Sequence, residues 1–140
     1  MDRVVIKTLS KNDLGISGSH QAGILVPKSL VKQAFFPPLD ESRQNPNCPV
    51  SVVSGEKKYE LNYVHYNSRV FGTGTRNEYR LTRLSQFFKD NDCSLGDRLV
   101  FSFNVETAQY SLSVERQRTQ SVHLKYTIEH PLVIHANWEF

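Results

Sequence analysis

Short extended segments recur along the chain and constrain its fold more than any other feature of the sequence. Each is β-branched or alternates apolar with polar residues, and each is bounded by polar or turn-forming residues, which is the pattern of a β-strand. Seven such segments are Arg3–Leu9, Ala22–Val26, Val50–Ser54, Lys58–His65, Leu99–Phe103, Tyr110–Val114 and Val122–Ile128. This succession of short strands predicts a small mixed β-barrel.

Turn residues separate several of these strands. Ser54-Gly55-Glu56 favours a hairpin, and a second hairpin should turn near Glu106-Thr107. Phe71-Gly72-Thr73-Gly74 predicts a bend between two extended pieces. The tail, His130–Phe140, is compatible with one more strand at an edge.

Two segments favour short helices. Within residues 28–36, apolar residues stand at helical intervals, and the prolines at 37 and 38 predict the end of this helix. Leu84–Asp90 allows one or two helical turns, with Ser85 as the N-cap. Leu39–Pro49 is a polar connector rather than a domain boundary. The expected fold class is mainly β (α+β), a seven-stranded barrel with two short helices, as a single domain over residues 1–140.

Composition narrows the classes of function. The chain has 140 residues and a net charge of only +3, so attraction to nucleic acid must come from locally concentrated charge. Cys48 and Cys93 are too few for a disulfide framework or a four-ligand zinc site. The first residues lack the apolar core of a signal peptide, and no apolar run reaches membrane-spanning length. We therefore expect an intracellular soluble protein.

Residues 66–83 concentrate cationic charge. Four arginines (Arg69, Arg76, Arg80 and Arg83) surround one acid, Glu78. Arg76, Glu78 and Arg80 are two residues apart, so an extended backbone places them on one face. Such a face suits base edges, because arginine donates twice to guanine and a carboxylate accepts from cytosine N4. The alternative is a solvated strand face with ion pairs across the sheet.

Two long polar loops are the places where function is expected on such a barrel. The first is Ser10–Gln21, which holds two glycines and three serines. The second is Asn67–Asn77, within the arginine-rich stretch.

The residues that form these loops also carry a family resemblance. IKTLSKNDLGISGSHQAGILVPKSLV (residues 6–31) and HYNSRVFGTGTRNEYRLTR (residues 65–83) closely resemble the N-terminal effector-binding domain of EcoRII-type restriction endonucleases. The run LGDRLVF at residues 95–101 is similar to a strand entry of the wider fold, which plant B-three domains share. The resemblance covers about residues 5–114. It implies a DNA-binding pseudobarrel whose two loops enter the major groove from either side, and the best-known member binds CC(A/T)GG.

The resemblance implies which residues of this chain contact DNA, since the family's DNA contacts can be transferred position by position. In the first loop they are Lys11, Asn12, Asp13, Ser17, Ser19, His20 and Gln21, and in the second loop and the strand after it Asn67, Ser68, Arg69, Thr75, Arg76, Asn77, Glu78, Tyr79 and Arg80. Arg76, Asn77, Glu78 and Arg80 are expected to read bases, and Lys11 and Arg69 to touch phosphate. Asp13 could accept from cytosine or close a turn before Gly15. His20 could donate to DNA or pack locally.

Two departures from the family pattern lower the charge of the second loop. Phe71–Arg76 is one residue longer than its family counterpart and lacks a lysine, and Tyr79 stands where the relative has another lysine. The resemblance further implies a cytoplasmic prokaryotic protein and a monomeric domain without cofactors. Catalysis with Mg²⁺ would belong to a separate C-terminal nuclease domain that these residues do not resemble.

Two rival functions come from other classes. Asp40, Glu56 and Lys58 imitate the carboxylate and lysine spacing with which restriction nucleases hold Mg²⁺. However, Glu56 lies in an expected turn and Asp40 in the connector, whereas this chemistry needs rigidly held groups. The other rival is an interaction module on the same barrel that binds protein or RNA.

Overall fold

A single curled β-sheet forms the body of the protein in the computed structural model, which describes residues 2–15, 23–116 and 133–134. The strands are β1 (Asp2–Thr8), β2 (Ile24–Val26), β3 (Asn47–Ser54), β4 (Lys57–Tyr66), β5 (Glu78–Thr82), β6 (Arg98–Asn104), β7 (Gln109–Glu115) and β8 (Val133–Ile134). The helices are α1 (Lys28–Lys32) and α2 (Ser85–Asp90). The predicted mainly β pseudobarrel with two short helices is confirmed for the described part of the chain.

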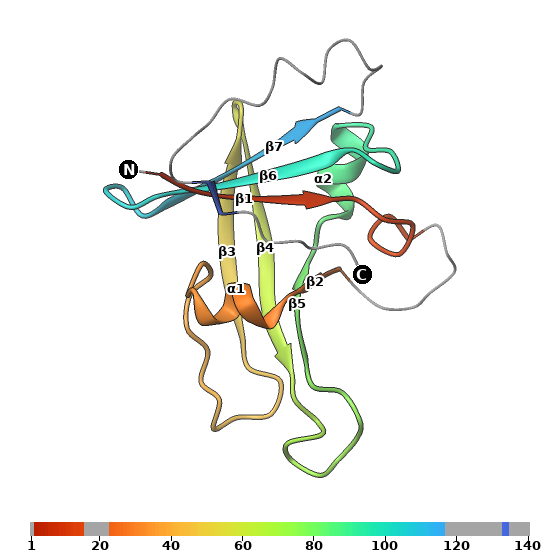
Figure 1. The fold of residues 1–140 in the computed structure, drawn as a ribbon, viewed down its shortest axis with the longest axis vertical. Coiled ribbons are helices and arrows are strands. Elements are labelled where there is room, and N and C mark those ends of the chain that lie inside the picture. The colour runs from red at the N-terminus through yellow and green to blue at the C-terminus, as the bar shows by residue number, and fades with distance from the viewer. Residues whose placement is uncertain (1, 16–22, 117–132, 135–140) are drawn as a thin grey trace.

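The strand order is β2-β5-β4-β3-β7-β6-β1-β8. Two long antiparallel hairpins, β3–β4 and β6–β7, join through a short parallel pairing of β3 with β7. In Figure 1, β1 and β6 cross β3 and β4 at a steep angle, which shows how strongly the sheet curls. β8 pairs with β1 at one edge, as expected for the tail, whereas the predicted strand Val122–Ile128 lies outside the described residues.

Both predicted hairpin turns are confirmed. In β3–β4, Ser54 pairs with Lys57, so Gly55 and Glu56 form a two-residue turn, and Gly55 has a φ of 59° that glycine adopts at little cost. In β6–β7, the side chain of Asn104 accepts from the amides of Glu106 and Thr107, both at 3.0 Å.

Alternating strand residues build an apolar core. Leu61 and Tyr63 of β4, Phe101 of β6 and Leu112 of β7 are buried members of this core. The two phenylalanines after α1 join them, and the Tyr110 hydroxyl donates to the Phe35 carbonyl at 2.6 Å inside the core. This contact ties the segment after α1 to the sheet.

Helix α1 is shorter than the sequence predicted. The apolar spacing indicated a helix as far as the two prolines, but Ala34 has a φ of 54°, which ends the helix after Lys32. The Arg3 side chain of β1 donates to the carbonyls of the two residues that follow Lys32, at 2.6 Å to Gln33 and 3.2 Å to Ala34. The turn at Ala34 releases the following phenylalanines from the helical path, so they pack into the core.

Helix α2 begins differently from the prediction. Leu84, not Ser85, occupies the N-cap position, and no side chain caps the helix. Leu84 and Phe87 are both buried, so core packing fixes where this helix starts. Within the described residues, no helix is long and apolar enough to cross a membrane.

Candidate functional site

The first loop leaves β1 through a turn that Asp13 closes. The Ser10 amide donates to Asp13 Oδ2 at 2.8 Å, and the Asp13 amide donates back to Ser10 Oγ at 3.3 Å. Lys7 Nζ lies 3.2 Å from the same carboxylate, and the Asp13 side chain is only 8% exposed. Of the two roles expected for Asp13, the structure therefore supports closing the turn.

Lys11 and Asn12 lie at the exposed tip of this turn. Four further candidates of the first loop, Ser17, Ser19, His20 and Gln21, lie outside the described residues. The structure thus describes only the base of the first loop, at the end of β1 (Figure 1).

The second loop connects β4 to β5 and is braced by its own backbone. The Arg69 amide donates to the Arg76 carbonyl at 2.9 Å, and the Thr73 amide donates to the Ser68 carbonyl at 2.9 Å. Ser68 Oγ also accepts from the Arg76 amide at 3.2 Å. Ser68 is therefore bound within the loop, while the Arg69 and Thr75 side chains are exposed.

Arg76, Glu78 and Arg80 do share one face, as their spacing predicted. Arg76 donates to Glu78 Oε1 from Nε at 2.9 Å and from Nη2 at 2.6 Å. Arg80 donates to the other oxygen, Oε2, at 3.2 Å. The Arg76 guanidinium also lies 3.8 Å from the centre of the Tyr66 ring, a cation–π contact. One carboxylate therefore bridges two guanidinium groups.

The electrostatics of this trio keep Glu78 ionised. Partial burial raises the pKa of Glu78, but the hydrogen bonds from Arg80 and Arg76 outweigh burial and hold that pKa below its ordinary value. At neutral pH the face consists of two cations around one anion.

The three members of this face differ in exposure. Arg76 is exposed and Glu78 is half-buried, whereas Arg80 is only 6% exposed. Arg80 Nη1 donates to the Gly23 carbonyl at 3.2 Å, so this side chain joins β5 to the segment that enters β2. The sequence predicted that Arg80 reads bases, but in the free protein its guanidinium is buried and donates to Gly23 and Glu78.

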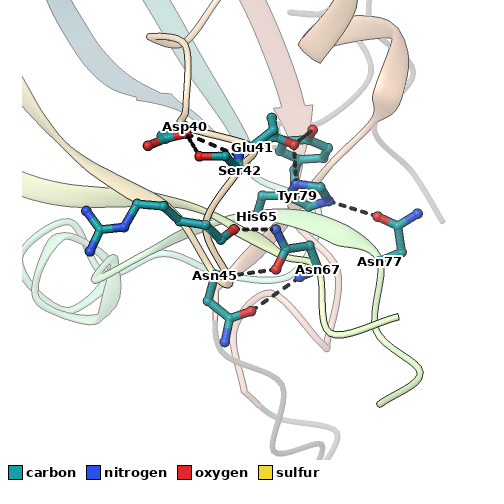
Figure 2. A network of polar contacts seen from close by, with 9 residues as sticks. Asp40, Glu41, Ser42, Asn45, His65, Asn67, Asn77 and Tyr79 are labelled. Carbon is teal, nitrogen blue, oxygen red and sulfur yellow. Dashed lines mark hydrogen bonds and ion pairs between the residues drawn. The ribbon is translucent and has the colours of Figure 1, made fainter. Parts of the chain in front are cut away.

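Asn67 is similarly committed to the structure. Its side chain is almost fully buried, with 1% of the residue exposed. Asn67 Oδ1 accepts from the Asn45 amide at 2.8 Å, Asn67 Nδ2 donates to the Arg43 carbonyl at 2.9 Å, and Asn45 Oδ1 accepts from the Asn67 amide at 3.3 Å. Figure 2 shows this reciprocal asparagine pair at the start of the second loop.

Asn77 and Tyr79 belong to a second polar network at the end of the same loop (Figure 2). Asn77 Oδ1 lies 2.8 Å from Nε2 of the buried His65, and His65 Nδ1 lies 2.6 Å from Glu41 Oε2. Tyr79 stacks on the His65 ring with centroids 3.9 Å apart and donates to Glu41 at 3.0 Å.

Sequence reasoning missed the partners of these networks. Asn45 is 22 residues from Asn67, and His65 is 12 residues from Asn77. Glu41 is 24 residues from His65, through which it is linked to Asn77. No local pattern signals such pairs. The connector that contributes Glu41 and Asn45 is exposed as well as polar, so its composition did not signal these contacts either.

The carboxylates of the rival nuclease site lie far apart. Asp40 adjoins Glu41 at the His65 end of β4, while Glu56 adjoins Lys57 at its other end. Eight residue steps of β-strand separate these ends by about 26 Å. Asp40 instead accepts hydrogen bonds from the Ser42 amide and hydroxyl. Within the described residues, no group of three or more possible metal ligands was found.

Comparison with known proteins agrees with the resemblance seen in the sequence. Residues 2–119 match the family described as "Restriction endonuclease EcoRII, N-terminal". The chain belongs to this EcoRII N-terminal family. Over 84 residues it is 42% identical to the type II restriction enzyme EcoRII of Escherichia coli, an alignment that covers 57% of this chain and 20% of the relative. The chain thus spans about a fifth of the length of that relative.

Membership in the EcoRII N-terminal family confirms the family resemblance that was identified in the sequence. The matched span contains both signature segments, including the whole second loop. It also contains Asn45 and His65, which the sequence did not mark as functional.

Proposed function

We propose that this EcoRII N-terminal domain binds double-stranded DNA in a sequence-specific manner, with the first and second loops entering the major groove of a short CC(A/T)GG-like site. The observation that carries the proposal is the second loop itself. It is internally hydrogen-bonded and exposed, and it holds Arg76 in contact with Glu78 at the end of the sheet.

The chemistry of the exposed groups suits this partner. The Arg76 guanidinium offers paired N–H donors, which match guanine O6 and N7. Glu78 Oε1 can accept from a cytosine amine when Arg76 turns to a guanine. Lys11 and Arg69 are exposed cations on the two loops, suited to phosphate contacts that position the duplex.

The other candidates divide between contact and support. Thr75 and Asn12 are exposed, so both are proposed to contact DNA. Ser17, Ser19, His20 and Gln21 lie outside the described residues and stay proposed contacts on the basis of the family resemblance. Asp13, Asn67, Asn77, Tyr79 and Arg80 support the loops through the contacts above, and Ser68 braces the second loop.

The role in a parent enzyme is part of the proposal. The domain would recruit or regulate a C-terminal nuclease domain of a cytoplasmic prokaryotic restriction endonuclease, as a monomeric unit that needs no cofactor. Mg²⁺ would serve only the nuclease domain. A single copy can embrace a nearly palindromic site because its two unlike loops each take one half.

A gel-shift titration tests the proposal directly. The domain is titrated with a CC(A/T)GG duplex and with a scrambled duplex of equal length and composition. We expect tighter binding of the former, and a loss of about tenfold or more in preference for Arg76→Ala, because one bidentate contact discriminates by roughly 1–3 kcal/mol. Lys58→Ala is the matched control, since Lys58 is an exposed cation near the end of β4 that lies opposite the second loop.

Selection from a random duplex library then defines the preferred site. Equal affinity for every duplex would overturn sequence-specific recognition. No affinity for duplex DNA at all would favour the alternative of a module that binds protein or RNA.

A further inference from the structure

The connector between α1 and β3 holds the second loop at three separate points. Asn45 holds the first residue of the loop, Asn67, through the reciprocal pair described above. Gln44 Nε2 donates to Thr73 Oγ1 at 2.8 Å near the middle of the loop. Glu41 reaches the last loop residue through His65. In Figure 1 the connector and the second loop extend from the same end of the β3–β4 hairpin.

His65 is the central residue of the third point. It belongs to β4, and 5% of it is exposed. Its backbone amide donates to the Pro46 carbonyl at 3.0 Å, and its ring lies flat against Tyr79 with an interplanar angle of 10°. The ring therefore cannot turn without disturbing both the connector and β5.

Both ring nitrogens of His65 face oxygen atoms. Nδ1 faces Glu41 Oε2 at 2.6 Å and Nε2 faces Asn77 Oδ1 at 2.8 Å. A neutral imidazole carries a single N–H, whereas the imidazolium carries two. Since a carboxylate and an amide oxygen are both acceptors, only the protonated ring satisfies both contacts at once.

Two phenols and one carboxylate are the other titratable groups around this ring. Burial chiefly raises the pKa of Tyr79 to about 12, with help from its hydrogen bond to Glu41. Burial also raises the pKa of Tyr63, which stacks on Tyr79 from β4. Both phenols thus stay neutral, and Glu41 is the acidic group in contact with the ring.

We propose that His65 is a positioning residue whose protonated ring ties Asn77 to Glu41 and thereby fixes the second loop for binding. This inference rests on the proposed function, because the loop that it fixes is the one assigned to DNA. Loss of the proton removes one of the two contacts, so the end of the loop loosens as the pH rises. Asn77 acts through this bridge and not as a contact to bases.

Amide hydrogen exchange of the DNA-free domain tests the bridge without reference to binding. His65→Gln removes the imidazole, with its two ring nitrogens, but keeps an amide that can bond to one partner. Exchange of amides in residues 67–77 is measured for both proteins between about pH 5.5 and 8.5, the range in which histidine changes charge. The ratio of the two rates at each pH cancels the intrinsic pH dependence of exchange.

We expect slower exchange in the wild type than in His65→Gln at low pH, by roughly tenfold, and equal rates in the two proteins at high pH. A ratio that is constant across this range would overturn the inference, because Asn77 would then present its amide nitrogen to a neutral ring. Glu41→Gln provides a second variant at an exposed connector residue should His65→Gln fail to fold. It should reduce the same pH dependence.

Affinity for the preferred duplex is measured over the same pH range as the second arm of the test. Wild-type affinity should fall several-fold more steeply with pH than that of His65→Gln. His20→Gln is the control for a histidine of the first loop, and it should keep the part of the pH dependence that belongs to His65. Failure to bind any duplex would refute the proposed function. The exchange data on the DNA-free domain would still show whether His65 links Asn77 to Glu41. Binding with identical pH profiles in wild type and His65→Gln would refute the inference alone.

Discussion

Arg80 gives the strongest test of the structure, because the sequence assigned it to base reading and the structure places it inside the sheet. The perturbation is Arg80→Ala. It removes the donor to Glu78 Oε2, the donor to the Gly23 carbonyl and a buried aliphatic stem. We therefore expect a folding defect in the absence of any DNA.

The size of the defect follows from these three contacts. A hydrogen bond to a charged group contributes about 1.5 kcal/mol at the low end of its range, which applies because Glu78 keeps Arg76 as a partner. The bond to the Gly23 carbonyl adds about 1 kcal/mol. The buried methylenes add about 2 kcal/mol. Freeing the restricted arginine side chain returns about 1.5–2 kcal/mol, which leaves a net loss of about 2.5–3 kcal/mol.

The assay is urea unfolding followed by circular dichroism. Arg80→Met keeps most of the stem and loses the two hydrogen bonds, about 2.5 kcal/mol by the same values. Partial freeing of the side chain returns up to about 1 kcal/mol, so the net cost should be about 1.5–2.5 kcal/mol. Lys58→Ala, at an exposed position, should stay within about 0.5 kcal/mol of the wild type. This order of stabilities separates packing from hydrogen bonding at Arg80.

A different result would return Arg80 to the DNA-reading set. If Arg80→Ala unfolds at the wild-type urea concentration yet accepts altered duplex sequences, its guanidinium is free to leave Glu78 and Gly23. The buried position described here would then be wrong for the protein in solution.

Three further predictions concern other parts of the chain. Gly23→Ala should lower the melting temperature of the domain severely, because Gly23 has a φ of +77° and a Cβ there would lie 2.9 Å from a backbone carbon of β5. Gly55→Ala is the control: a Cβ at Gly55 meets nothing within 4 Å, so this change should cost only about 1 kcal/mol of stability. Arg69→Ala should weaken all duplexes alike and reduce the salt slope of binding by about one, and an unchanged slope would show that it touches no phosphate. Hydrogen bonds, the largest from Tyr59, lower the pKa of Asp90 from 3.8 to about 2, so its ionised form stabilises the fold above about pH 4 and that contribution is lost as the pH falls toward 2. Asp90→Asn should remove this acid-dependent part of the urea stability, and an unchanged acid limb would contradict the assignment.

The strands could be predicted because their signal is local. Alternation of apolar and polar residues within each segment reflects the pleat, and it located β1, β3, β4, β6 and β7 to within a few residues. The hairpin at Gly55 was equally local, since a two-residue turn needs a residue that tolerates positive φ.

The ends of the helices could not be predicted from such patterns. Ala34 takes a left-handed conformation although alanine has no preference for it, because the turn lets two phenylalanines reach the core and Arg3 caps the freed carbonyls. Leu84 likewise takes an N-cap position without a capping side chain because it is buried. In both places tertiary packing overrides local propensity.

The location of the candidate site could be predicted from the sequence. Which of its residues are available to DNA and which support the loop could not. Composition marked the second loop, and spacing placed Arg76, Glu78 and Arg80 on one face, which the structure confirms. Asparagine and arginine are equally suited to a base edge and to a backbone carbonyl. Only the three-dimensional partner decides between these uses, and for Asn67 that partner, Asn45, lies 22 residues away.

The bridge through Glu78 explains how ion pairing and DNA recognition can coexist on one face. Its two oxygens have unlike partners: Oε2 is held by buried Arg80, whereas Oε1 is held by exposed Arg76. An exposed ion pair contributes little net free energy, so a DNA edge can replace the Arg76 contact at small cost. The contact with Arg80 is shielded from such exchange, and it keeps the carboxylate in place and ionised. Under the proposed function, Arg80 therefore serves recognition by fixing the acceptor, while Arg76 is the group that moves onto the bases.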